Sequence, residues 1–140
     1  MITQPGPGII DVHGLLVREL RDNEALTALV GARIYARKYP DRVTLPACRI
    51  NYPNADAMAQ PTLQWFTYDG QVDVHADTHI VASGIAAVLQ TALLALENAT
   101  YPEGVVSTVE PFGVRSGFDA EWTPPKPHWI VSARIRASGP

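Results

Sequence analysis

Residues 71–98 read QVDVHADTHIVASGIAAVLQTALLALEN and carry the strongest pattern in the chain. Val72 and Val74 alternate with Asp73 and His75, which is the period-two signature of a strand with one buried face. In such a strand the two valines face the core, and Asp73 and His75 face solvent. The spacing therefore predicts a half-buried strand that leads directly into the segment after it.

That following segment is predicted to be a helix that reaches about Asn98. Asp77 or Thr78 can cap its start, because a short side-chain oxygen accepts a hydrogen bond from a free backbone N–H. The apolar residues form two adjacent stripes: Val81, Ile85, Val88, Ala92 and Leu96, and beside them Ala82, Ala86, Leu89 and Leu93. A helix with so narrow a polar face must be covered on more than one side, by a sheet and by a second helix or a neighbouring subunit. The small residues in its first turns, Gly84 among them, predict a closely packed partner.

The remaining pattern predicts a single α+β domain. Apolar residues at helical spacing indicate an amphipathic helix from Ile9 to Arg21, and a short helix follows that ends at Gly31. Extended segments are predicted at 33–35, 47–52, 62–68, 105–109 and 129–136, and loops at 38–45 and 53–60. The Asp69-Gly70 pair indicates either a hairpin turn or a bulge within one longer strand. We expect a mixed or antiparallel sheet of about four to five strands, with two to three helices packed on it.

The chain of 140 residues is predicted to have three parts. Residues 1–8 hold two prolines and two glycines, which predict a flexible N-terminal arm. Residues 9–137 form the single domain, and 138–140 form a short C-terminal tail.

A long loop is predicted in the C-terminal hairpin, from Glu110 to His128. This segment is rich in glycine and proline, and long loops in compact domains are usually functional. Phe112, Phe118 and Trp122 lie within it, and exposed aromatic side chains on a stiff loop are typical of a contact site. The alternative is that Trp122 folds back onto the sheet.

Arg33 and Arg37 belong to the one basic cluster in the sequence, which also contains Lys38 and Arg42. It is interpreted as a solvated or subunit-contact surface, with contact to DNA phosphates as the alternative.

The composition excludes several classes of protein. Apolar residues make up 46% of the chain, which excludes general disorder, and the net charge of −3 disfavours nucleic-acid binding as the main role. Cys48 is the single cysteine, so an intrachain disulfide and a cysteine-based zinc site are excluded, and a small buried apolar role is expected for it. We find no apolar run of about 18 residues and no signal-peptide pattern, so we expect a soluble protein made inside the cell, with no membrane contact.

Asp73, His75, Asp77 and His79 are spaced by two residues and would share one face of a continuous strand. Such a face could hold a metal ion, but a helix that begins near Asp77 turns the last two side chains away. No nucleophile elbow, P-loop or dinucleotide fingerprint occurs. The sequence therefore predicts no catalytic residues, no cofactor and no metal site. A small metal-dependent enzyme using Asp73, His75 and His79 is kept as an alternative.

The order of the segments is informative as a whole. An amphipathic helix precedes LTALVGARIY at 26–35, and LPACRINY follows at 45–52. The strand-helix unit at 72–96 comes next, and WIVSARIRA at 129–137 closes the domain. This arrangement resembles the tail-terminator (tail-completion) proteins of long-tailed bacteriophages over most of residues 9–137.

The resemblance implies a non-enzymatic virion protein of the tail or neck, assembled in the host cytoplasm. Its subunits would form a hexameric ring on the head-proximal end of the tail tube, stop tube polymerisation and dock the head connector. The implied partners are further copies of the chain, the tail-tube protein and a head–tail connector or stopper protein, while DNA passes through the lumen without specific binding. Another neck component, such as a head-closure or adaptor protein, is the alternative. The candidate interface residues are Phe112, Phe118, Trp122, Arg33 and Arg37.

Overall fold

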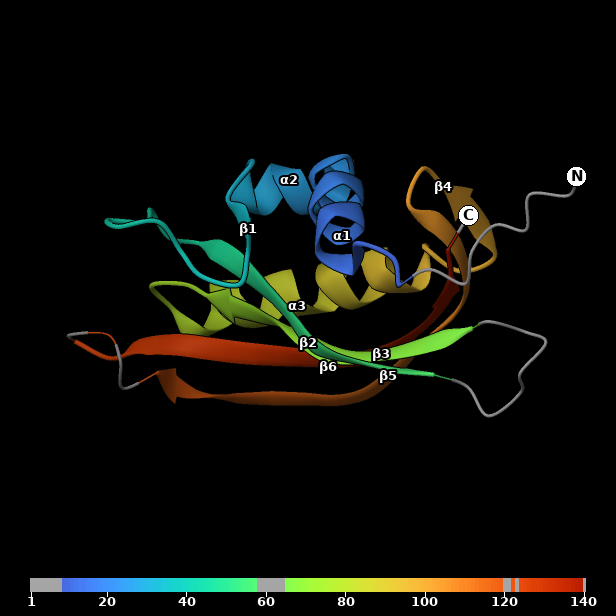
Figure 1. The fold of residues 1–140 in the computed structure, drawn as a ribbon. Helices are drawn as coiled ribbons and strands as arrows, with labels where there is room; N and C mark the ends of the chain where they lie inside the picture. Colours follow the sequence, from blue (N-terminus) through green and yellow to red (C-terminus); the bar gives the residue numbers. More distant parts are fainter. Residues whose placement is uncertain (1–8, 58–64, 120–121, 123, 140) are drawn as a thin grey trace, which may run out of the picture.

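The computed structural model describes residues 9–57, 65–119, 122 and 124–139. These residues form three helices and six strands in one sheet (Figure 1). The helices are α1 (Val12–Arg21), α2 (Glu24–Val30) and α3 (His79–Leu94). The strands are β1 (Ile34–Ala36), β2 (Ala47–Ala57), β3 (Phe66–His75), β4 (Ala99–Tyr101), β5 (Gly104–Asp119) and β6 (Lys126–Ser138). The predicted arm at 1–8 lies outside the described residues.

The strand order across the sheet is β1-β2-β3-β6-β5-β4. β1 runs parallel to β2, and every other neighbouring pair is antiparallel. Helices α1, α2 and α3 all lie on one side of this sheet (Figure 1). The predicted α+β class, the mixed sheet and the number of helices are confirmed, and the sheet has one strand more than expected.

The core lies between this helical layer and one face of the sheet. Val72 and Val74 of β3 are fully buried on that face, as the alternation predicted. Leu15, Leu16 and Leu89 pack against the sheet from the helices with no exposed surface. Cys48 is also fully buried, and burial raises the pKa of its thiol to about 12, so it remains a protonated, apolar side chain.

The opposite face of β3 differs from the prediction. Asp73 and His75 turn away from the helices, but they are only 2% and 0% exposed. The prediction that they face solvent was wrong, because side chains of the neighbouring strands and of a loop cover them. A period-two pattern identifies which residues share a face but does not reveal what covers that face.

Helix α3 begins after Thr78, whose hydroxyl accepts a hydrogen bond from the Val81 N–H at 3.3 Å. Its inner side is buried against the sheet, but Ile80 is 83% exposed and Leu94 is 42% exposed. Nothing lies within 4 Å of the position where a Cβ on Gly84 would stand. Within the described residues, the predicted close partner at Gly84 is therefore not found, and part of the apolar surface of α3 stays uncovered.

Asp69 and Gly70 lie inside β3, so the longer strand, and not the hairpin turn, is the correct alternative. The irregularity sits in the partner strand instead. Asn51 pairs with Gln71 and Asn54 pairs with Asp69, so two residues of β2 oppose Gly70 alone. β2 thus continues through residues 53–57, which were wrongly predicted as a loop, while residues 58–60 of that segment lie outside the described residues.

The bulge in β2 is tied to α1 by a side chain. His13 Nε2 accepts a hydrogen bond from the Tyr52 backbone N–H at 3.1 Å. Burial and the nearby charge of Arg37 lower the pKa of His13, so its ring is neutral at pH 7 and offers the lone pair that this bond needs. His13 therefore provides an acceptor for a backbone donor at the irregular point of the β2–β3 ladder.

The predicted long loop from Glu110 to His128 was wrong. β5 extends to Asp119 and β6 begins at Lys126, so most of this segment is a two-stranded ribbon (Figure 1). Register shifts between Val106 and Thr108, and between Pro111 and Gly113, accommodate residues that usually break strands. Among the described residues, no strand pairs with the outer edge of β5 beyond Val106, and proline is tolerated on such an edge.

The contact at Gly70 yields a prediction about stability. A Cβ at this position would stand 2.4 Å from the Asn51 carbonyl oxygen and 2.6 Å from the Tyr52 Cα, which are backbone atoms that cannot turn aside. We expect Gly70→Ala to lower the free energy of unfolding by about 2 kcal/mol. Gly84→Ala is the matched control, because it meets nothing and gains helix propensity of up to about 1 kcal/mol. Urea denaturation of both variants measures the difference, and equal effects would contradict this role of Gly70.

The acceptor role of His13 yields a prediction about pH. Because its pKa is lowered in the folded state, the unfolded chain binds the proton first as the pH falls. The contribution of His13 to stability is complete above pH 6.5 and is lost as the pH falls from there toward the folded-state pKa. We expect His13→Gln, which keeps an acceptor but does not titrate, to remove up to about 1 kcal/mol of the acid sensitivity between pH 7.5 and 5. Parallel pH profiles for the two proteins would argue against the role.

Candidate functional site

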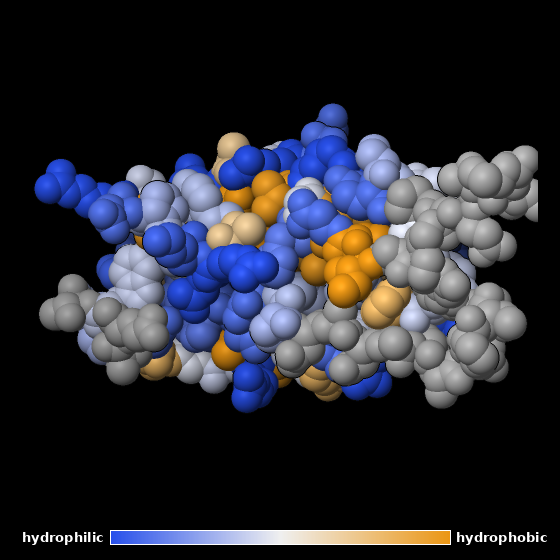
Figure 2. Space-filling model, in the orientation of Figure 1, coloured by the Kyte–Doolittle hydropathy of each residue, from blue (hydrophilic) through white to orange (hydrophobic). Residues whose placement is uncertain are grey.

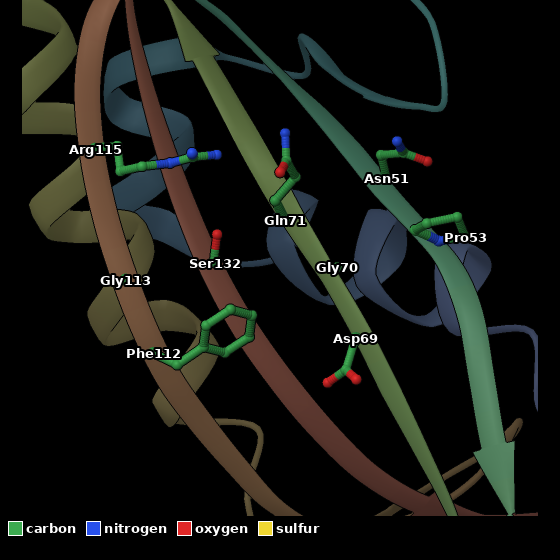
Figure 3. Close-up of a pocket in the computed structure, with 9 residues that line it drawn as sticks. All are labelled: Asn51, Pro53, Asp69, Gly70, Gln71, Phe112, Gly113, Arg115 and Ser132. Carbon is green, nitrogen blue, oxygen red and sulfur yellow. The ribbon is translucent and has the colours of Figure 1, made fainter.

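The face of the sheet opposite the helices carries a hollow of about 490 Å³. Its floor is lined by small residues, Gly70, Gly113 and Ser132, from three neighbouring strands. Figure 3 shows Phe112 and Arg115 of β5 reaching across β6 toward β3. This open face is the part of the fold where polar side chains of β2, β3, β5 and β6 meet without a helix above them.

Two cross-strand ion pairs organise this face. Arg49 Nε and Nη2 donate to the same Asp73 oxygen, Oδ2, at 3.0 and 2.8 Å, and Gln71 donates to the other oxygen, Oδ1, at 2.7 Å. Burial acts to raise the pKa of Asp73, but contacts with His128 and Arg49 outweigh it and hold that pKa below its usual value. The second pair, Arg134 with Asp69 at 2.7 Å, lies in a more exposed position.

Two histidines and a carboxylate meet at one end of this face, on three adjacent strands. His75 of β3 pairs in register with His128 of β6, and their rings stack with centroids 4.2 Å apart and planes 10° apart. His75 Nε2 lies 2.8 Å from Asp119 Oδ2 at the end of β5, and its Nδ1 lies 2.8 Å from the Tyr39 hydroxyl. Burial dominates the protonation of His75 and lowers its pKa, so the ring is neutral at pH 7.

Aromatic side chains cover this cluster. The Trp122 ring lies 5.5 Å from the His75 ring and 6.1 Å from the Tyr39 ring, so the structure places Trp122 against the sheet. The guanidinium of Arg49 lies 5.3 Å above Tyr39, next to its ion pair with Asp73. The cluster is therefore shielded from solvent by residues from the 37–46 loop and from the tip of the β5–β6 ribbon.

The run of four predicted at 73–79 does not assemble into one group. Asp77 forms an ion pair with Lys126 at 2.9 Å, and His79 begins α3 with its ring 5.4 Å from that of Trp129. His75 instead meets Asp119 and His128, which sequence reasoning missed because both fell in the predicted loop. Only the register of β3, β5 and β6 brings these residues together, and no local spacing signals it.

The other candidate interface residues are not members of the cluster. Phe112 and Phe118 on β5 are 58% and 69% exposed. Arg33 is half-buried and donates from Nε to the Pro46 carbonyl at 2.8 Å, whereas Arg37 is exposed and has a φ of 70°. On the face drawn in Figure 2, hydrophobic surface occurs in separate patches among broader hydrophilic areas.

Comparison with known proteins gives a fold and no family. No family model and no curated protein matches the sequence. A solved structure does match. A chain described as "Virion of native gene transfer agent (GTA) particle" has the same fold, with a TM-score of 0.74 and 18% identity. The likeness covers 91% of this chain and 95% of that one. None of the helices among the described residues is long and apolar enough to cross a membrane.

The two ion pairs on the open face are predicted to differ in their effect on stability. Arg49→Met leaves the Asp73 carboxylate, whose side chain is 3% exposed, without its cation, and we expect a loss of about 3 kcal/mol. Arg134→Met is the matched control, because the Arg134 and Asp69 side chains are 48% and 34% exposed and solvent replaces the partner. Denaturant unfolding of each variant measures the change. A loss at Arg134 as large as that at Arg49 would refute the distinction.

Proposed function

We propose that this chain is a structural virion protein of a phage or phage-like particle. In this proposal its subunits form a ring at the head-proximal end of the tail tube, where the ring ends tube polymerisation and docks the head connector. The protein acts through its contacts and catalyses no reaction. The ring is a hexamer, as the resemblance to tail terminators implies.

The observation that carries this proposal is the fold likeness to a chain of the gene transfer agent virion. It spans 91% of this chain and 95% of that one, so it joins two nearly complete chains and not a shared fragment. The identity of 18% limits the likeness to the fold itself. The tail-terminator resemblance of the sequence is a second, independent reason to propose a virion role.

Uncovered surface on two parts of the molecule supports assembly. Ile80, at 83% exposure, and Leu94 leave part of the apolar side of α3 bare. Phe112, Val114 and Phe118 lie on β5, whose outer edge has no partner strand beyond Val106 among the described residues. A closed ring is built from head-to-tail contacts, which need two different patches on each subunit. The α3 surface and the β5 edge are two such patches.

The proposed interface residues follow from this arrangement. In this proposal Phe112 and Phe118 contact a neighbouring subunit or the tube, and the exposed Arg37 and the half-buried Arg33 contribute charge to a second contact. Trp122 packs on Tyr39 and His75, so its contribution is to position the ribbon tip that carries Phe118. DNA passes the ring without specific binding, in keeping with the net charge of −3.

A second candidate within the same class is a head-closure or adaptor protein of the neck. The fold likeness favours neither role over the other, because the matched structure is that of a whole virion particle. Image reconstruction of virions that contain the labelled chain separates them. Density between tube and connector supports the terminator role, and density within the connector supports the alternative.

The test of assembly is the mass of the untagged protein in solution, alone and mixed with the tail-tube protein of the same virion. We expect a closed ring in at least one condition. Phe118→Ser should disrupt that ring by removing apolar contact area, with a loss of roughly 1–2 kcal/mol per contact. Ile9→Ser is the matched control, since Ile9 is also 69% exposed but lies outside the proposed patches. A protein that stays monomeric in both conditions would refute the proposal.

A further inference from the structure

None of the proposed contacts with other proteins involves the cluster of His75, Asp119 and His128. Each residue offers one ligand atom, and the three atoms lie within 4.8 Å of one another. They come from β3, β5 and β6, which are adjacent strands paired in register, so the backbone holds them at this spacing. Two imidazoles and one carboxylate form a donor set typical of borderline divalent ions such as Zn²⁺.

We propose that His75, Asp119 and His128 bind one divalent transition-metal ion. His75 ligates through Nε2 and Asp119 through a carboxylate oxygen, with His128 as the third ligand. One water molecule, enclosed with the ion, completes a tetrahedral site.

The surroundings of His75 are suited to ligation. A ligating histidine is normally oriented by a hydrogen bond at its other ring nitrogen, and Tyr39 lies 2.8 Å from Nδ1. The Tyr39 hydroxyl also reaches the Ala47 carbonyl, to which it donates at 3.2 Å. When the hydroxyl donates to Ala47, Nδ1–H of His75 donates to the Tyr39 oxygen, and the Nε2 lone pair then faces Asp119.

The number of protons on His75, Asp119 and Tyr39 is the same with and without the ion. Without an ion, the proton on Nε2 lies between His75 and Asp119, whose atoms are 2.8 Å apart. When the ion takes that position, the imidazole stays neutral and its proton resides on Nδ1, while the Tyr39 hydrogen turns to the Ala47 carbonyl. Tyr39 can therefore serve both states without leaving a buried donor or acceptor unpaired.

His128 contributes an independent observation. Its Nε2 is buried and makes no hydrogen bond, although it lies 3.5 Å from Asp73 Oδ1. Buried polar atoms without a partner are rare and call for an explanation. The parallel stacking on His75 means that ligation requires the His128 ring to turn toward the shared ion, and this rotation exchanges the 3.5 Å contact of Nε2 with Asp73 Oδ1 for contact with the ion.

Besides the rotation of the His128 ring, the required changes in the distances between ligand atoms are small. Two ligands at about 2.1 Å from a tetrahedral ion lie about 3.4 Å apart. His75 Nε2 and Asp119 Oδ2, now 2.8 Å apart, must therefore separate slightly, while the widest pair must close from at most 4.8 Å. The charge of Arg49 does not oppose the ion strongly, because Arg49 is already paired with Asp73.

An ion at this position would join the ends of three strands. Asp119 is the last residue of β5, and His128 is near the start of β6, so the bound ion would fix the tip of the ribbon on β3. The ribbon tip also carries the exposed Phe118. The inference nevertheless stands apart from the ring, because it concerns the folded subunit alone.

The test uses the untagged full chain, freed of metal by chelation and then titrated with ZnCl₂ and separately with CoCl₂. We expect one Zn²⁺ per chain by elemental analysis after desalting. The visible spectrum of the Co²⁺ form should show the intense bands of a tetrahedral site. Saturating Zn²⁺ should raise Tm by roughly 5 °C or more. Absence of stoichiometric binding to the folded wild-type chain would overturn the proposal.

Variants locate the site. Asp119→Asn keeps the size of the side chain and a hydrogen-bonding partner for His75, and it should weaken Zn²⁺ binding at least about 100-fold, as should His128→Gln. Tyr39→Phe, which removes only the orienting hydroxyl, should weaken binding roughly tenfold at unchanged stoichiometry. His79→Gln is the control of the same residue type, because His79 lies beside Trp129 and outside the group of three.

Circular dichroism of the metal-free variants checks that each one is folded. Should His128→Gln unfold, the conservative Asp119→Asn decides the question by itself. Binding that survives both substitutions, or that is lost in His79→Gln, would place the ion elsewhere and refute the assignment.

Discussion

The continuous antiparallel pairing of β3 with β6 is the constraint on which the rest of the fold depends. Its register runs from Phe66 opposite Ala137 to His75 opposite His128 without a shift, whereas the β2–β3 ladder contains one shift and the β5–β6 ladder contains two. One face of this pair buries the valines beneath the helices. The other face sets His75 beside His128, so this one register contributes to both the core and the polar cluster.

The sequence was informative wherever structure is local. The strand at Val72 and Val74, the helix after Thr78 and the two N-terminal helices follow from spacing and capping, which involve residues close in the chain. The sequence was uninformative wherever the conformation or burial of a residue depends on a partner that is distant in the chain. Pro111 and Gly113 predicted a loop, because nothing nearby indicates that these residues lie on the edge of a sheet and within a bulge. The burial of Asp73 likewise depends on Arg49, which lies on another strand.

The polar cluster could not have been predicted from the sequence either, because its members are distant in the chain. His75 and Asp77 are close in the chain, yet the helix that begins at His79 separates them in space. Asp119 and His128 are far from His75 in the chain, and two ladders bring them to it. The fold likeness to a virion chain at 18% identity is a parallel case, since two sequences that differ at most positions form the same architecture.

The edge of β5, which has no partner strand beyond Val106 among the described residues, also bears on the behaviour of the free chain in solution. A long exposed strand edge is a template on which other chains can add strands, and a free subunit is at risk of uncontrolled polymerisation. Pro111 brings no N–H to that edge, and the adjoining bulge breaks the regular spacing of its donors and acceptors. Pro111 and the adjoining bulge, which led the sequence to predict a loop, thus also hinder the addition of a further strand to this edge. They make the edge a poor substrate for amyloid-like growth while its aromatic side chains stay accessible.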